Sequence, residues 1–98
     1  MAANERLYIV TYDIGDQKRW RRVFRAMEAY GRWLQFSVFQ CRLTPRRRAA
    51  LGARLDGIIK PSEDHVLIID IGPADAVDPR VESLGRPFEA IRREAVVV

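Results

Sequence analysis

The sequence predicts a single α+β domain, and three observations lead to this fold class. The segments 7–14 and 65–71 are short, apolar and rich in β-branched residues, as buried strands are. Two segments with helical periodicity, 16–30 and 44–59, separate the strands. The segment 32–43 between them is too long and too β-prone for one short strand, so it supplies two. The order β-α-β-β-α-β is that of the ferredoxin-like sandwich.

The first predicted strand, 7–14, is largely apolar on both faces. This pattern predicts a central strand that is covered on both sides. Helices can cover one side of the sheet, and a second subunit is a natural cover for the other.

The first predicted helix is capped by Asp16, runs to about Tyr30 and stops at Gly31. Its apolar residues recur at helical spacing and form one core-facing stripe. The basic residues of its first half are either solvated surface or a phosphate-contact zone. The stripe comprises Trp20, Val23, Phe24, Met27 and Tyr30, and the basic residues are Lys18, Arg19, Arg21, Arg22 and Arg25.

The hairpin is expected to turn near Phe36–Ser37, although no Gly, Asn or Pro marks the turn. Thr44 and Pro45 then begin the second helix as N-cap and first helical residue. The first turn of this helix holds Arg46, Arg47 and Arg48. A helix dipole prefers anions there, so the three arginines are easier to understand if they face an external polyanion.

The 98 residues fit one domain, with a core at about 6–71 and a β-prone tail at about 80–98. Residues 81–84 form a possible short strand. The chain ends in Val96–Val98, and an exposed apolar terminal strand tends to aggregate unless it is paired. A lone cysteine, Cys41, excludes an intrachain disulfide and predicts a thiol in the strand core. No apolar run is long enough for a membrane span and no signal-peptide pattern is present, so a cytoplasmic protein is expected.

The net charge of +4 is unevenly distributed along the chain. Residues 1–60 contain 13 of the 17 basic residues but only 5 of the 13 acidic ones, and 15 of the basic residues are arginines. Arginine forks match phosphate oxygens well, so a basic half suggests a polyanion partner, RNA or DNA. Arginine enrichment from a GC-rich genome is the alternative explanation.

Three sequence features in order resemble the Cas2 family, the second adaptation family of CRISPR-associated proteins. They are a strand ending in Tyr12-Asp13-Ile14, a basic helix containing Arg22-Val23, and a hairpin with the sequence Gln35-Phe36-Ser37-Val38-Phe39. The resemblance covers about residues 6–71.

This resemblance implies a symmetric homodimer whose sheets face each other and whose C-terminal segments pack across the dimer. It also implies that Asp13 lies near the two-fold axis, where two copies could share a Mg²⁺ (or Mn²⁺) ion. The implied function is CRISPR adaptation with the CRISPR integrase as partner, and members are often described as metal-dependent ribonucleases or deoxyribonucleases. Besides Asp13, the residues that can be carried over are Arg22, Ser37 and Phe39.

Asp13 is the candidate metal ligand and catalytic residue, because Mg²⁺ in a phosphodiesterase is held by carboxylate oxygens. The alternative is that Asp13 merely caps the following loop or helix. Asp70 is expected at the opposite end of the sheet and Asp16 is used as a helix cap, so one chain offers few convergent carboxylates. Two Asp13 side chains across a two-fold axis would remove this shortage.

The candidate nucleic-acid contacts are Arg19, Arg22, Arg46, Arg47 and Arg48. Ser37 either orients a phosphate or satisfies the turn, and Phe39 either stacks on a base or packs in the core. His65 shows no evident partner and is interpreted as structural or exposed.

Three functions remain open from the sequence. The first is a metal-dependent endonuclease that uses Asp13, and the second is a non-catalytic DNA-binding scaffold of the integrase complex. The third is a small regulator or toxin unrelated to CRISPR, against which the hairpin sequence argues.

Overall fold

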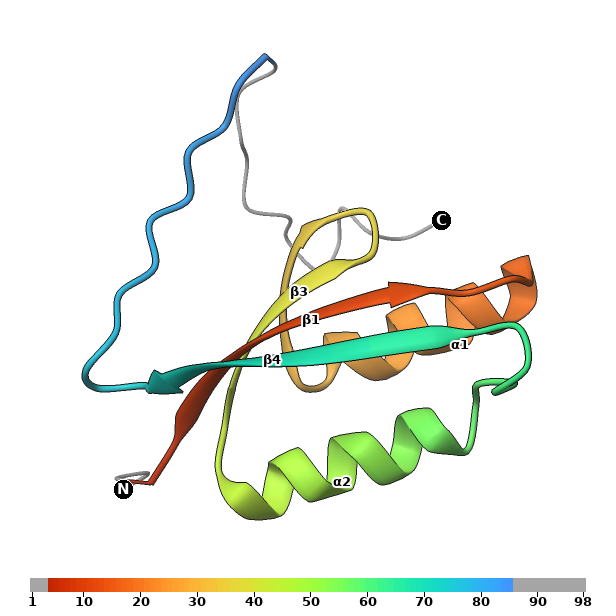
Figure 1. Cartoon of the computed structure of the whole chain (residues 1–98), viewed down its shortest axis with the longest axis horizontal. Coiled ribbons are helices and arrows are strands. Elements are labelled where there is room, and N and C mark those ends of the chain that lie inside the picture. Colours follow the sequence, from red (N-terminus) through yellow and green to blue (C-terminus); the bar gives the residue numbers. More distant parts are fainter. Residues whose placement is uncertain (1–3, 86–98) are drawn as a thin grey trace.

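The computed structural model describes residues 4–85, which form a four-stranded antiparallel sheet with two helices on one side (Figure 1). The strand order is β2-β3-β1-β4, which confirms the predicted ferredoxin-like topology and places β1 between two neighbours. The elements in chain order are β1 (Arg6–Asp13), α1 (Gln17–Glu28), β2 (Gly31–Gln35), β3 (Val38–Leu43), α2 (Pro45–Asp56) and β4 (His65–Pro73).

Both helices begin directly after the N-cap residues that the sequence predicted, Asp16 and Thr44. The Asp16 carboxylate accepts a hydrogen bond from the Arg19 amide at 3.0 Å, and the Thr44 hydroxyl accepts one from the Arg47 amide at 3.2 Å. Since these side chains satisfy amides that the helices leave free, they fix the first turn of each helix.

The first helix ends at Glu28, two residues before the predicted end at Tyr30. Gly31 follows the helix end, as predicted, and it also allows β2 to approach β3 closely. A Cβ atom at this position would lie 2.6 Å from the carbonyl oxygen of Gln40 and would overlap the Cys41 sulfur. The close approach of β2 to β3 therefore requires glycine here.

The hairpin between β2 and β3 turns at Phe36–Ser37, as predicted. Phe36 adopts a positive φ of 30°, in the region that favours glycine. Its ring is 72% exposed and lies 5.4 Å from the ring of Trp20. The turn thus forms without Gly, Asn or Pro, and Phe36 takes up a backbone conformation that an L-residue rarely adopts.

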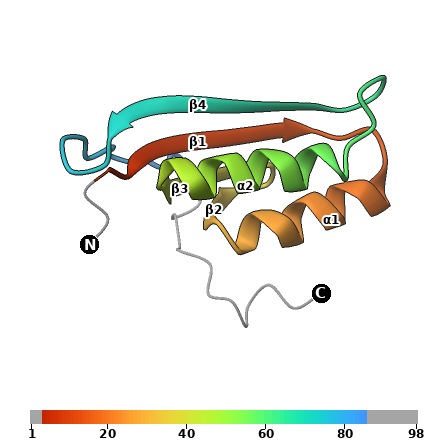
Figure 2. The same ribbon diagram turned by 90° about the horizontal axis from the view of Figure 1, so that it is seen from below.

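The two faces of the sheet differ sharply in how they are covered (Figure 2). The helices lie against one face and enclose a core whose largest fully buried side chains are Phe39, Met27, Leu43 and Leu51. Neither of the two helices within residues 4–85 lies over the other face. There Leu67, Ile69 and Ile71 of β4 remain 47%, 45% and 39% exposed.

Residues 81–84, which the sequence offered as a possible short strand, do not belong to a strand within residues 4–85, and Leu84 is 96% exposed. The chain leaves β4 as an extended segment (Figure 1). The predicted tail pairing through Val96–Val98 lies outside the described residues. Neither helix within residues 4–85 has the length and apolar character needed to cross a membrane.

Candidate functional site

Asp13 is the last residue of β1, and its side chain is exposed. It shares the uncovered face of the sheet with Ile9 and Thr11, because alternate residues of a strand point the same way. Within residues 4–85 its carboxylate has neither a hydrogen-bond donor nor a basic partner. The capping role that the sequence left open is therefore not what Asp13 does within this part of the chain.

His65 is the cross-strand neighbour of Asp13, since β4 begins where β1 ends. Residues directly opposite each other in an antiparallel pair share one face of the sheet. The sequence-based interpretation left His65 as structural or exposed, and the structure shows it exposed, but that interpretation missed this neighbour. The antiparallel order of the two strands was the signal that could have found it.

On the other side of β1, the hairpin turn is joined to the same strand end. The amide of Tyr12 donates a hydrogen bond to the Ser37 carbonyl oxygen at 3.2 Å. Asp13 thus lies between the start of β4 and the turn that presents Phe36.

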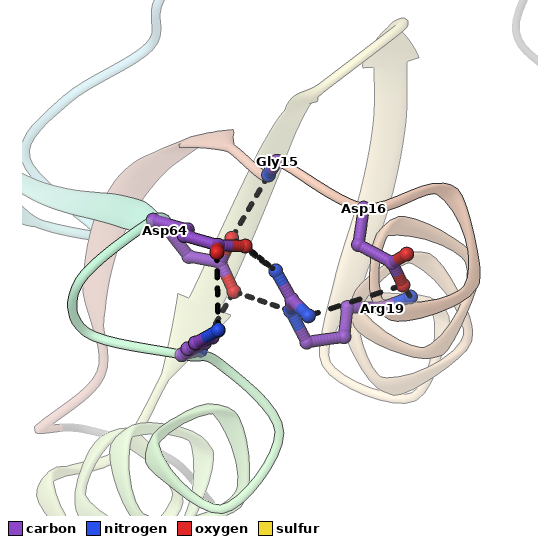
Figure 3. A network of polar contacts seen from close by, with 6 residues as sticks. Gly15, Asp16, Arg19 and Asp64 are labelled. Carbon is purple, nitrogen blue, oxygen red and sulfur yellow. Dashed lines mark hydrogen bonds and ion pairs between the residues drawn. The ribbon is translucent and has the colours of Figure 1, made fainter.

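Behind the strand end, a buried carboxylate joins two loops (Figure 3). The Asp64 side chain is fully buried and accepts hydrogen bonds from the backbone amides of Gly15 at 2.8 Å and Lys60 at 2.7 Å. It also accepts one from Arg19 Nε at 2.8 Å. This network, the Asp64 clamp, fastens the loop after Asp13 to the loop before β4.

The Asp64 carboxylate stays ionised because its hydrogen-bond donors stabilise the charge by more than burial destabilises it. The hydrogen bond from Arg19 is the main reason why the pKa of Asp64 is held well below its ordinary value, and the amides of Lys60 and Gly15 add to it. The pKa of Glu63 is also lowered, first by Lys60 and then by Arg19. The sequence indicated only a turn here, because two of the partners, Gly15 and Arg19, lie 49 and 45 residues from Asp64.

The five arginines predicted to contact phosphate fall into different roles. The Arg19 guanidinium is engaged by Asp64 and Glu63, so its predicted role as a free phosphate contact is not supported. Arg47 donates to the Ala29 carbonyl at 2.8 Å, and Arg48 lies over the Tyr8 ring at 6.0 Å. Arg22 and Arg46 are exposed and have no carboxylate partner within residues 4–85.

Ser37 and Phe39 serve the fold. The Ser37 hydroxyl accepts a hydrogen bond from Trp20 Nε1 at 2.8 Å, which satisfies the turn, as one of the two alternatives predicted. Phe39 is fully buried in the core, so its ring is not available for stacking on a base. Cys41 is fully buried as well, and burial raises the pKa of its thiol to about 12.

One chain supplies few ligands for a metal ion. Asp70 is opposite Tyr8 and bound to Arg6 at 2.9 Å, which confirms its predicted place at the far end of the sheet. Within residues 4–85 no three metal-ligating side chains converge. The free carboxylate of Asp13 is the type of ligand that a hard cation prefers.

These features define a class of protein: a ferredoxin-like sandwich with one uncovered apolar sheet face and a free carboxylate at its edge. The family model described as "CRISPR associated protein Cas2" matches residues 6–77. The chain therefore belongs to the Cas2 family, as its sequence features predicted.

Known relatives agree along most of the chain. It is 52% identical to the CRISPR-associated endoribonuclease Cas2 1 of Rhodospirillum rubrum, over 96% of this chain and 92% of the relative. It is 53% identical to the CRISPR-associated endoribonuclease Cas2 of Geobacter sulfurreducens, over 96% of this chain and 99% of that one. The crystal structure of Streptococcus pyogenes Cas2 at pH 6.5 superposes with a TM-score of 0.70 at 33% identity, covering 81% of this chain and 99% of that one.

Proposed function

We propose that this protein is a homodimeric, Mg²⁺-dependent endoribonuclease that takes part in CRISPR adaptation and uses Asp13 from both copies. The observation that carries the proposal is the position of Asp13, a carboxylate without a partner at the edge of an uncovered apolar face. The names of the two relatives above, both endoribonucleases, support the reaction class. The integrase is the partner that the family resemblance implies.

The dimer is proposed from the uncovered face. Leu67, Ile69 and Ile71 form a row of exposed apolar side chains along β4, and such rows mark interaction surfaces. A symmetric dimer would place the same surface of both copies in contact. A two-fold axis near the end of β1 would then bring the two Asp13 carboxylates together.

Two carboxylates fit Mg²⁺ (or Mn²⁺), which commonly takes one or two carboxylates and keeps several waters. When bound, the ion supplies an activated water and stabilises charge on phosphate oxygens. In this proposal Asp13 holds the ion, and His65 lies beside it as a hydrogen-bonding group for the substrate. The Asp64 clamp keeps the loop that follows Asp13 in place.

The test is cleavage of labelled single-stranded RNA and duplex DNA by the wild type and by Asp13→Asn, with Mg²⁺ or EDTA, from pH 6 to 9. We expect RNA cleavage that requires the metal and falls at least about 100-fold in Asp13→Asn. Asp78→Asn is the matched control, because Asp78 is exposed in the loop after β4, far along the chain from Asp13. Cleavage that is equal in both variants would contradict the role of Asp13.

A non-catalytic scaffold is the second candidate, and the scarcity of metal ligands favours it, since many phosphodiesterases use two ions. In that case the dimer binds duplex DNA and bridges integrase subunits. An absence of cleavage under every condition, with salt-sensitive duplex binding and capture of the integrase, would support the scaffold and reject the nuclease.

A further inference from the structure

A groove runs between the two helices, on the side of the molecule away from the uncovered sheet face. Its volume is about 420 Å³, several times the space of a water molecule. The lining residues are Arg22, Arg25, Ala53, Arg54, Gly57 and Ile58.

The three groove arginines differ from the arginines that stabilise the fold. Arg6 and Arg42, like Arg19 of the clamp, are bound to carboxylates at 2.8 to 2.9 Å. Within residues 4–85, no carboxylate pairs with Arg22, Arg25 or Arg54. Three like charges around one groove repel each other, so a bound anion would relieve this repulsion.

The groove is also open to a ligand. Ala53 and Gly57 stand one helical turn apart and put almost no side-chain volume into it. A Cβ atom at Gly57 would meet only the backbone oxygens of Arg54 and Ala53, at 3.5 and 3.7 Å. Space for a ligand therefore exists without rearrangement.

We propose that this interhelical groove binds the phosphodiester backbone of nucleic acid through Arg22, Arg25 and Arg54. The inference rests on the nucleic-acid binding of the proposed function and names the surface that performs it. Guanidinium forks match phosphate oxygens, and backbone contacts need no particular base. A dimer formed through the uncovered sheet face leaves the helix side free for this contact.

An acidic protein is a weaker match for the groove. Protein interfaces rely on buried aromatic and aliphatic anchors, and Ile58 is the one large apolar residue among those that line it. Arg25 and Arg54 also lie in the last turns of their helices, where cations favour the dipole. A purely helix-stabilising role predicts a change in thermal stability without a change in binding.

The experiment measures binding of a fluorescein-labelled 30-base-pair duplex DNA between 50 and 300 mM NaCl. The test variant is Arg22→Gln/Arg25→Gln/Arg54→Gln. We expect its Kd at 100 mM NaCl to rise at least about 10-fold, and the slope of log K against log salt to fall by about 2 to 3. The same measurement with a single-stranded 30-nucleotide RNA determines which nucleic acid the groove prefers.

A matched control removes the same charge elsewhere. Arg21, Arg32 and Arg80 are exposed, lie outside the groove and lack a carboxylate partner within residues 4–85. Arg21→Gln/Arg32→Gln/Arg80→Gln should reduce the slope by less than about 1. If both triple variants lose the same affinity and salt slope, the attraction between protein and nucleic acid is diffuse, and the groove proposal is rejected.

A second variant keeps all the arginines. Ala53 is exposed and lines the groove, so Ala53→Glu adds an anion there without removing a cation. We expect it to weaken binding about 5-fold or more while the fold is retained. If the wild type binds nucleic acid and both groove variants bind equally well, the groove is not the binding surface, although the protein still binds nucleic acid. If the wild type binds neither the DNA nor the RNA, both the groove proposal and the nucleic-acid part of the proposed function are rejected.

Discussion

The two faces of the sheet use the same kinds of residue for different purposes. On β4, Val66 and Ile68 pack against the helix-covered core, while Leu67 and Ile69, which alternate with them along the strand, remain exposed by nearly half. Within residues 4–85 the helices fill one face of the sheet, whereas the other face leaves apolar side chains exposed, and the proposed dimer would cover them. Asp13 lies at the edge of the incomplete face, so the proposed chemistry depends on assembly as well as on folding.

The largest effect is expected from a cavity in the covered face. Leu51 of α2 is fully buried, so Leu51→Ala should lower the free energy of unfolding by about 2–5 kcal/mol. Urea unfolding followed by circular dichroism measures this loss. A loss below about 1 kcal/mol would mean that the helices pack loosely on the sheet, so that the two faces differ less in packing.

A charge on the uncovered face should affect assembly instead. Ile69→Glu should leave a folded monomer and raise the dimer Kd by about 100-fold, because each symmetric interface receives two charges. Analytical ultracentrifugation measures the Kd. Ala50→Glu, at an exposed position of α2, is the control that should not change it. A variant Ile69→Glu that remains a tight dimer would place the interface elsewhere.

The Asp64 clamp predicts a loss of stability in acid. Because the pKa of Asp64 is lower in the folded protein than in the unfolded chain, its carboxylate stabilises the fold above about pH 4. This contribution is lost as the pH falls further, toward the folded-state pKa. Asp64→Asn should lower Tm by about 5–10 °C at pH 7, and the difference from wild type should narrow toward pH 2.

Differential scanning fluorimetry from pH 2 to 8 records both Tm values. Asp56→Asn is a matched control, because Asp56 is exposed and has no ion pair within residues 4–85. A constant gap between Asp64→Asn and wild type at every pH would show that the carboxylate charge is not what stabilises the two loops.

The smallest effect is expected on the affinity of the metal-free dimer, from Asp13 at the edge of the uncovered face. If two Asp13 carboxylates approach each other in the dimer, Asp13→Asn should strengthen the metal-free dimer by up to about 1 kcal/mol. Sedimentation in EDTA measures this change, and Mg²⁺ should strengthen only the wild-type dimer. A dimer Kd that is the same for both proteins, with and without Mg²⁺, would place the two carboxylates far apart.

The sequence by itself determined the elements and their order. The N-caps, the apolar stripe of the first helix and the two-sided apolar pattern of β1 are local signals, and local signals survive without tertiary context. The resemblance to the Cas2 family singled out Asp13 at the end of the first strand, whereas the residues alone left a capping role open. The hairpin turn at Phe36–Ser37 followed from the length and the β-prone composition of the segment 32–43, although its positive φ did not.

Only the tertiary structure decided which polar groups meet. The Asp64 clamp joins residues 45 to 49 positions apart, and the pair Asp13–His65 depends on strand register. Contacts of this kind have no sequence period, because they are set by how loops converge after the strands pair. For the same reason the basic residues of the first half looked alike in the sequence. The fold uses Arg19 internally, while it leaves Arg22, Arg25 and Arg54 around an open groove.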